Sequence, residues 1–210
     1  MDQMLRIRPH KARVLKTEIH YGRLFSVGQD HMFCDYDLTR SEKRHTLDIK
    51  KGLLDMNVNY EENQVAFLRL NGIVDFYSIH DYQKQLYEID LSDRHNSELT
   101  CFTWTKPNQM AIGIEDGSLL LYDTRNLRRP LTETSVSSKP KRIKLLKNGT
   151  ILVLSDRLDF LDSYMIHQKA LIVDADGRSL SAVTEDVDRN SIIVSGFDQK
   201  LHFFKLKNQL

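Results

Sequence analysis

Five segments of the chain share one arrangement of apolar and polar positions. Each has an apolar run, a turn with an acidic or Asn residue, and an alternating run that ends in an aromatic residue or Leu. Alternation with period two predicts a β-strand, and the nearly continuous apolar run before the turn fits a strand buried on both faces. The five segments cover residues 24–38, 65–79, 110–124, 151–164 and 192–206.

The turn residue of these segments recurs at a nearly constant spacing of 40 to 45 residues. A short acidic or Asn side chain bonds to local backbone groups and supports the tight turn of a hairpin. The aligned turn residues are Asp30, Asn71, Asp116, Asp156 and Asp198. The strand-ending residues, six positions later or five in the fourth segment, are Tyr36, Tyr77, Tyr122, Leu161 and Phe204.

Further strand-like pieces lie between the five segments, which makes roughly four strands per unit of about 42 residues. These pieces are HTLDI, QLYEIDL, LTCFTW, KRIKLL, ALIVDA and LSAVTE. Four-stranded sheets at this period are typical of a β-propeller of the WD-repeat type. A β-sandwich also has short, evenly spaced strands, but it would not repeat the turn acid and the aromatic residue five times. We therefore predict an all-β WD40-type β-propeller with five blade units, a single domain over residues 1–210, and almost no helix.

The five units leave two interpretations of the blade count open. In one, the ring has five blades and the early stretch MLRIRP, residues 4–9, supplies the outer strand that the last unit lacks. Such a strand would cover a sheet edge that otherwise invites aggregation. In the other, the chain is a reduced or partial copy of a larger ring and lacks its first two blades.

The balance of charge argues against a molecule-wide attraction to nucleic acid or to acidic membranes. Lys and Arg number 30 and Asp and Glu 29, so that the formal net charge is +1. Cys34 and Cys101 each lie in an apolar run, which indicates buried thiols in a reducing compartment rather than a disulfide framework. No apolar run approaches the ~18 residues of a membrane-spanning helix. The sequence therefore predicts an intracellular protein that does not contact membranes.

Candidate chemistry is sparse. The eight histidines form no metal-binding pattern, Asp93, Arg94 and His95 lie in a polar connector, and there is no phosphate loop or nucleophile elbow. Acidic residues that recur at strand positions are interpreted as structural parts of the repeat; they are Asp35, Asp37, Asp75, Asp123, Asp159 and Asp162. We expect no catalytic residue, no metal, no cofactor and no small-molecule substrate.

Two basic stretches between the third and fourth units are the best candidates for a binding site. The first follows the strand end Tyr122-Asp123, and the second is the run SKPKRIKLLK. Because they are close in sequence, we expect them to form one basic patch suited to phosphate contacts. The alternative is a solvated, solubilising face. The candidate residues are Arg125, Arg128, Arg129, Lys139, Lys141, Arg142, Lys144 and Lys147.

The first basic stretch also carries a family resemblance. Residues 121–123 (LYD), 128–131 (RRPL) and 133–134 (ET), followed by an Asn-Gly turn and by SGFD with Leu201, resemble the nucleolar WD-repeat assembly factors of the large ribosomal subunit, the WD repeat-containing protein 74 type. The resemblance covers about residues 110–206. The Arg-Arg-Pro step is its sharpest element, because Ser-Gly-x-Asp is common to WD repeats in general.

The resemblance implies a non-catalytic scaffold in the nucleus and nucleolus. It would bind pre-60S particles and other assembly factors, with pre-rRNA as a further contact, and an AAA-type ATPase would release it. The family has seven blades and a basic tail, whereas this chain shows five units and stops at Leu210. The alternative is a generic WD-repeat interaction subunit of another intracellular complex, whose partner binds away from the basic residues.

Overall fold

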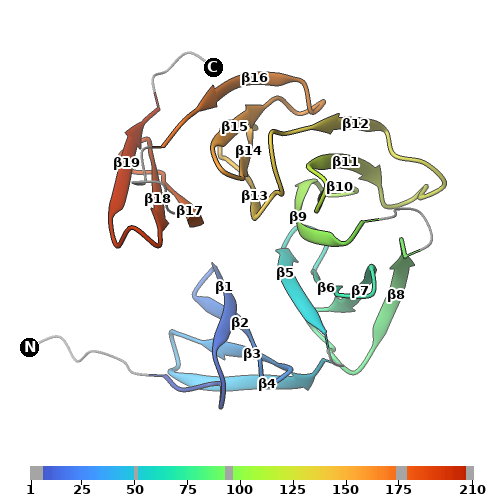
Figure 1. Ribbon diagram of the computed structural model, residues 1–210. Helices are drawn as coiled ribbons and strands as arrows, with labels where there is room; N and C mark the ends of the chain where they lie inside the picture. Colours follow the sequence, from blue (N-terminus) through green and yellow to red (C-terminus); the bar gives the residue numbers. More distant parts are fainter. Residues whose placement is uncertain (1–6, 50–51, 93–96, 174–178, 207–210) are drawn as a thin grey trace, which may run out of the picture. The chain divides into compact units, whose positions relative to one another are not determined.

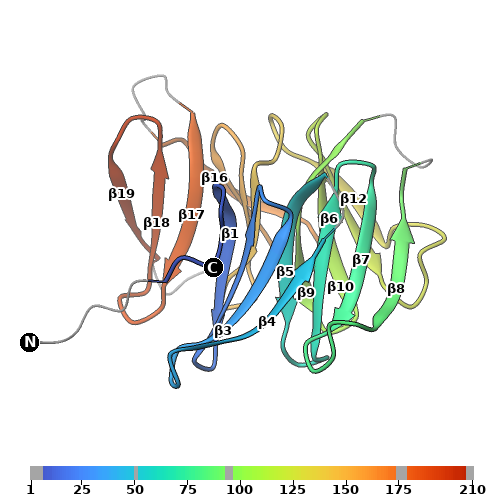
Figure 2. The same ribbon diagram turned by 90° about the horizontal axis from the view of Figure 1, so that it is seen from below.

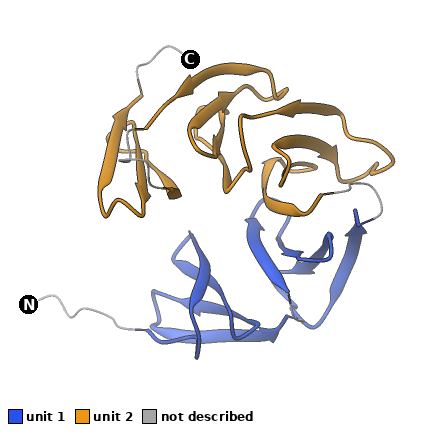
Figure 3. Cartoon of the chain, in the orientation of Figure 1, with its two compact units in different colours: residues 1–96 blue, residues 97–210 orange. Residues whose placement is uncertain are grey.

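The computed structural model describes residues 7–49, 52–92, 97–173 and 179–206. Two compact units make up the chain, residues 1–96 and residues 97–210 (Figure 3). The single domain expected from the sequence remains a prediction, and each unit has its own sheets and its own core.

Unit 1 consists of two four-stranded antiparallel sheets, in each of which the strands follow one another in chain order (Figure 1). β1 and β5, the first strands of the two sheets, lie beside each other. The strands of the first sheet are β1 (Val14–His20), β2 (Arg23–Gly28), β3 (Met32–Asp37) and β4 (Glu42–Asp48). Those of the second are β5 (Leu53–Asn59), β6 (Gln64–Arg69), β7 (Ile73–Ser78) and β8 (Gln85–Asp90).

Unit 2 contains three antiparallel sheets of the same kind, and β13 contacts both β9 and β17. The first sheet has β9 (Leu99–Lys106), β10 (Gln109–Ile114), β11 (Ser118–Asp123) and β12 (Thr132–Ser135). The second has β13 (Arg142–Leu145), β14 (Ile151–Leu154), β15 (Leu158–Leu161) and β16 (His167–Leu171). The third has β17 (Leu180–Asp186), β18 (Ser191–Gly196) and β19 (Leu201–Lys205).

The five predicted units are confirmed as five sheets. All helical or strand structure of the described residues is β-strand, as predicted. Neighbouring strands within each sheet run side by side, with the connections at the strand ends (Figure 2). No part of the described chain forms a helix long and apolar enough to cross a membrane. The predicted strand pieces omitted β1 and β5, and β16 begins earlier than the piece ALIVDA.

The hairpin turns explain the recurring acid. His31, Gly72, Gly117 and Gln199, which each follow an aligned turn residue, have a positive φ between 61° and 97°. Asp30, Asp116 and Asp198 accept a hydrogen bond from the backbone N–H two residues later. Left-handed backbone suits Gly and is costly for other residues, so these local bonds help to hold the turns that have His31 or Gln199.

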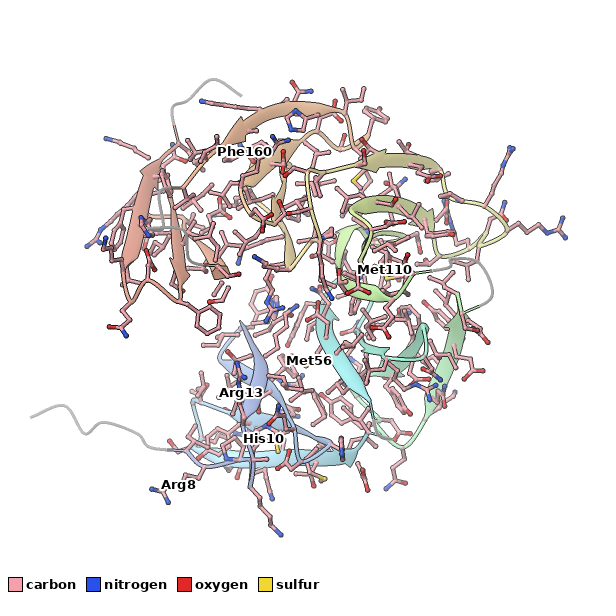
Figure 4. The ribbon with its side chains drawn as sticks, in the orientation of Figure 1. Arg8, His10, Arg13, Met56, Met110 and Phe160 are labelled. Carbon is pink, nitrogen blue, oxygen red and sulfur yellow. The ribbon has the colours of Figure 1, made fainter. Side chains whose placement is uncertain are left out.

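Buried apolar side chains fill the space between neighbouring sheets within each unit. In unit 1, Phe25, Phe33 and Phe67 belong to one cluster that joins the two sheets. In unit 2, one cluster joins the β9–β12 and β13–β16 sheets and another joins the β13–β16 and β17–β19 sheets. Met56, Met110 and Phe160, labelled in Figure 4, are all buried.

The expected N-terminal strand falls partly on residues 4–6, outside the described residues. Ile7 to Pro9 are described and belong to no strand. The segment that follows binds the first sheet, where His10 Nε2 lies 2.8 Å from Ser26 Oγ and His10 Nδ1 lies 3.0 Å from Asp30 Oδ1 (Figure 4). The sheet β17–β19 has three strands within the described part of the chain.

Candidate interaction surface

The strand acids bond to nearby side chains. Asp35, which is fully buried, forms an ion pair with Arg23 and accepts a hydrogen bond of 3.1 Å from the Tyr82 hydroxyl. Burial and the Asp35 charge raise the pKa of Tyr82. In the other sheets Asp75 pairs with Arg69, and Asp159 pairs with Arg157 and His167. These contacts give the acids a structural role within the repeat.

The described residues contain one acid–histidine–serine contact, that of His10 with Asp30 and Ser26, but no cluster of metal ligands. No group of three or more His, Cys, Asp and Glu side chains that could hold a metal ion occurs among them. Asp93 to His95, the one acid–histidine stretch considered from the sequence, lies outside the described part of the chain.

The predicted basic residues fall into separate groups, and the expectation of a single basic patch is wrong. Leu121 pairs with Thr132 and Ser118 pairs with Ser135, so that β12 carries the chain back along β11. The connection 124–131 is therefore at one end of the sheet, and Lys139 is at the other. The strands β11 and β12, about 13 Å for four residues, separate the two basic stretches, which were expected to be neighbours.

Lys139 and Lys141 lie at one end and are compensated by acids. Lys139 Nζ is 2.5 Å from Glu115 Oε1. Lys141 Nζ is 3.4 Å from Asp156 Oδ1 and 2.7 Å from Ser179 Oγ. The hydrogen bond from Ser138, and then Lys141, lower the pKa of Asp156.

Arg142, Lys144 and Lys147 belong to β13 and the turn after it. Arg142 and Lys144 are half-buried and alternate with the buried Ile143, so they share one face of the strand. Arg142 donates to the carbonyl of its neighbour Lys141 at 2.7 Å. Lys147 is exposed, and its backbone N–H donates to Glu185.

Arg125 lies at the opposite end from Lys139, where it is bound to the acid that ends β11. Its Nε and its second terminal nitrogen lie 2.9 and 2.6 Å from the two carboxylate oxygens of Asp123. These hydrogen bonds lower the pKa of Asp123 to about 2. The Arg125 charge is therefore compensated inside the loop.

Arg128 and Arg129 differ from the other candidates. Both are exposed on the connection between β11 and β12, which extends outward in Figure 1, and neither forms an ion pair within the described residues. Leu131, which closes this connection by donating its N–H to the Leu121 carbonyl at 2.7 Å, is 54% exposed. The connection therefore carries two cations without an ion pair among the described residues and one exposed aliphatic side chain, Leu131.

The turn after β15 adds an aromatic residue that the sequence analysis missed. Tyr164 is 65% exposed, Ile166 is 59% exposed, and Lys106 Nζ lies 5.6 Å from the centroid of the Tyr164 ring. Tyr122-Asp123 and Leu161-Asp162 occupy the same position in two repeat units. This correspondence was a sequence signal that the turn after β15 is equivalent to the connection with Arg128. We name as the Arg–Tyr surface the residues Lys106, Arg128, Arg129, Leu131, Tyr164 and Ile166.

Comparisons with known proteins bear on the fold. No protein-family model matches the chain, and no curated protein matches it in sequence. Among solved structures, the crystal structure of the WD40 β-propeller domain of Doa1 is similar with a TM-score of 0.77 and 17% sequence identity. The alignment covers 96% of this chain and 66% of the Doa1 domain, so the chain spans slightly less than two thirds of that domain. Five sheets of WD-repeat spacing and this likeness together show that the chain has a WD40 β-propeller fold with five blades.

Proposed function

We propose that the protein is a non-catalytic interaction scaffold. The observation that carries this proposal is the contrast between two sets of charged groups. The strand acids are held by partners inside the sheets, whereas Arg128 and Arg129 are exposed on a loop and form no ion pair within the described residues. Loops on a rigid β-scaffold are a common place for binding residues, and Arg is among the residues that contribute most to binding energy.

We further propose that the scaffold acts in assembly of the large ribosomal subunit, in the nucleus and nucleolus. Support comes from the resemblance in residues 121–134, where a strand ending in Tyr122-Asp123 leads into Arg128-Arg129-Pro130. Its partners would be other assembly factors and pre-60S particles. The second candidate is an interaction subunit of another intracellular complex, which the WD40 fold serves equally well.

A tagged pull-down from cells tests this proposal, comparing the wild type with Arg128→Glu/Arg129→Glu. Arg40→Glu/Lys43→Glu is the matched control, because it makes the same charge change at exposed residues of unit 1. We expect large-subunit precursors with the wild type and the control, and their loss with the test variant. Recovery of a different complex by all three proteins would reject the ribosomal role and favour the second candidate.

A further inference from the structure

We propose that the Arg–Tyr surface binds an extended, acidic protein segment that also carries aliphatic or aromatic side chains. This inference rests on the proposed scaffold function and names the chemistry of the partner. It concerns only residues of unit 2.

The backbone places all six residues at the same end of these two sheets. Gln109 pairs with both Lys106 and Asp123, and the Thr124 N–H donates to the Asn108 carbonyl at 2.9 Å. The turn after β9 and the connection after β11 therefore begin side by side. The Lys106–Tyr164 contact links this end to the turn after β15.

The conformation of the turn after β15 keeps the side chains of Tyr164 and Ile166 exposed. Met165, between them, is 1% exposed and belongs to the apolar cluster that includes Leu121 and Leu161. Met165 has a φ of 65°, and the Asp162 carboxylate accepts hydrogen bonds from the N–H groups of Tyr164 and Ile166 at 2.8 and 3.0 Å. A buried anchor and two backbone bonds thus present exposed apolar side chains in a fixed turn, which lowers the entropy cost of binding them.

The charge of the surface favours an anionic partner. The acids at this end already have other roles, since Asp123 binds Arg125 and Asp162 caps its own turn and accepts from Gln168 at 3.3 Å. Arg128 and Arg129 form no ion pair among the described residues, and they are available to carboxylates or phosphates.

The apolar part of the surface favours a protein segment over RNA. Single-stranded nucleic acid binds through several aromatic planes along a basic groove, whereas this surface has one exposed aromatic residue, Tyr164. Leu131 and Ile166 are aliphatic and more than half exposed, and phosphates would leave them without an apolar contact. Because the residues come from loops of two sheets, an extended segment suits them better than a compact ligand.

The test selects random peptides displayed on phage against the full chain, with the Arg128→Glu/Arg129→Glu protein as counter-selection. We expect selected peptides rich in Asp and Glu together with Leu, Ile, Phe or Tyr. Fluorescence anisotropy should then give a Kd about tenfold or more weaker for Arg128→Glu/Arg129→Glu and for Tyr164→Ser/Ile166→Ser, as expected for central interface residues. The control Arg40→Glu/Lys43→Glu should bind like the wild type.

Three results would overturn the inference: no selected peptide that depends on Arg128 and Arg129, no loss of affinity with Tyr164→Ser/Ile166→Ser, or tighter binding of a random single-stranded RNA pool than of the best peptide. Circular dichroism and urea unfolding confirm that each variant is folded. These results are separate from the cell pull-down, because acidic-peptide binding without ribosomal precursors would reject only the ribosomal role.

Discussion

At the scale of single residues, the buried ion pair of Arg23 and Asp35 lies within the first sheet of unit 1 and is linked to the second sheet by hydrogen bonds with Tyr82. The Arg23 side chain is 10% exposed and also donates to the Tyr82 hydroxyl at 3.1 Å. Asp35→Ala leaves this guanidinium buried without its carboxylate, so we expect a loss of about 3–5 kcal/mol in the free energy of unfolding. Urea denaturation measures the loss.

The control for this prediction is Glu42→Ala, which breaks an exposed pair with Arg40 at 3.7 Å. Exposed pairs contribute little, so its effect should stay within about 1 kcal/mol. Equal effects of Asp35→Ala and Glu42→Ala would contradict the structural role of the buried pair.

The contact between Asp123 and Arg125 is expected to depend on pH. Its pKa of about 2, below the ordinary 3.8, means that its contact with Arg125 stabilises the fold above about pH 4 and that this contribution is lost as the pH falls toward 2. An NMR titration of the Asp123 carboxyl carbon should therefore have its midpoint near 2. Arg125→Gln should raise the midpoint toward 3.8, whereas Arg129→Gln should leave it unchanged. A shift with both variants would show that Arg129 shares the carboxylate.

At the scale of the elements, the turn between β10 and β11 depends on Gly117. A Cβ at this position would lie 2.9 Å from the Val136 carbonyl oxygen, and φ is 97°. At Gly149, φ is 84° but nothing lies within 4 Å of the added atom. We expect Gly149→Ala to cost about 1 kcal/mol through backbone strain alone, and Gly117→Ala to cost about 1–3 kcal/mol more because of the clash.

Urea unfolding of the two alanine variants measures this difference. Since both positions have the left-handed backbone, Gly149→Ala serves as the matched control for strain. Equal losses would mean that the Val136 carbonyl moves aside without cost.

The hairpins could be predicted from the sequence, because the turn acid and the strand-ending residue repeat at a nearly fixed distance. β5 was missed although its sequence LLDMNVN alternates apolar and polar residues, because the repeat was aligned on the turn acid and the strand-ending residue, which both lie after this strand. The pattern would in any case have put Asp55, Asn57 and Asn59 on an exposed face, whereas all three are buried. The sequence does not show that Lys16, which belongs to the neighbouring sheet, places its Nζ 2.9 Å from Asp55 Oδ1.

The basic residues were predicted as a patch because they lie close together in sequence. The pairing of β11 with β12 decides the outcome, since it sends the connection 124–131 to one end of the sheet and Lys139 to the other. Which cations are compensated depends on ion pairs such as Lys139 with Glu115, which join residues that no local sequence pattern relates. Tyr164 was missed for the same reason, because the buried position of its neighbour Met165 depends on packing between two sheets.

At the scale of the whole molecule, each compact unit contains one buried thiol. Cys34 in unit 1 is 1% exposed, Cys101 in unit 2 is 0% exposed, and burial raises the pKa of Cys34. A thiol reagent needs both access and thiolate, so both residues should react slowly in the native protein and rapidly in denaturant. Their labelling therefore reports the opening of each unit separately.

A crossed experiment uses these two thiols with the variants above. Asp35→Ala removes a contact between the sheets of unit 1, so it should accelerate labelling of Cys34 more than that of Cys101. Cys101 on β9 pairs with Gly113 on β10, in the sheet that Gly117→Ala strains. Gly117→Ala should therefore accelerate labelling of Cys101 more than that of Cys34. Mass spectrometry of peptides after timed labelling measures both rates in one sample. Equal acceleration of both thiols by each variant would contradict separate opening, because it would mean that the chain opens as a single cooperative body.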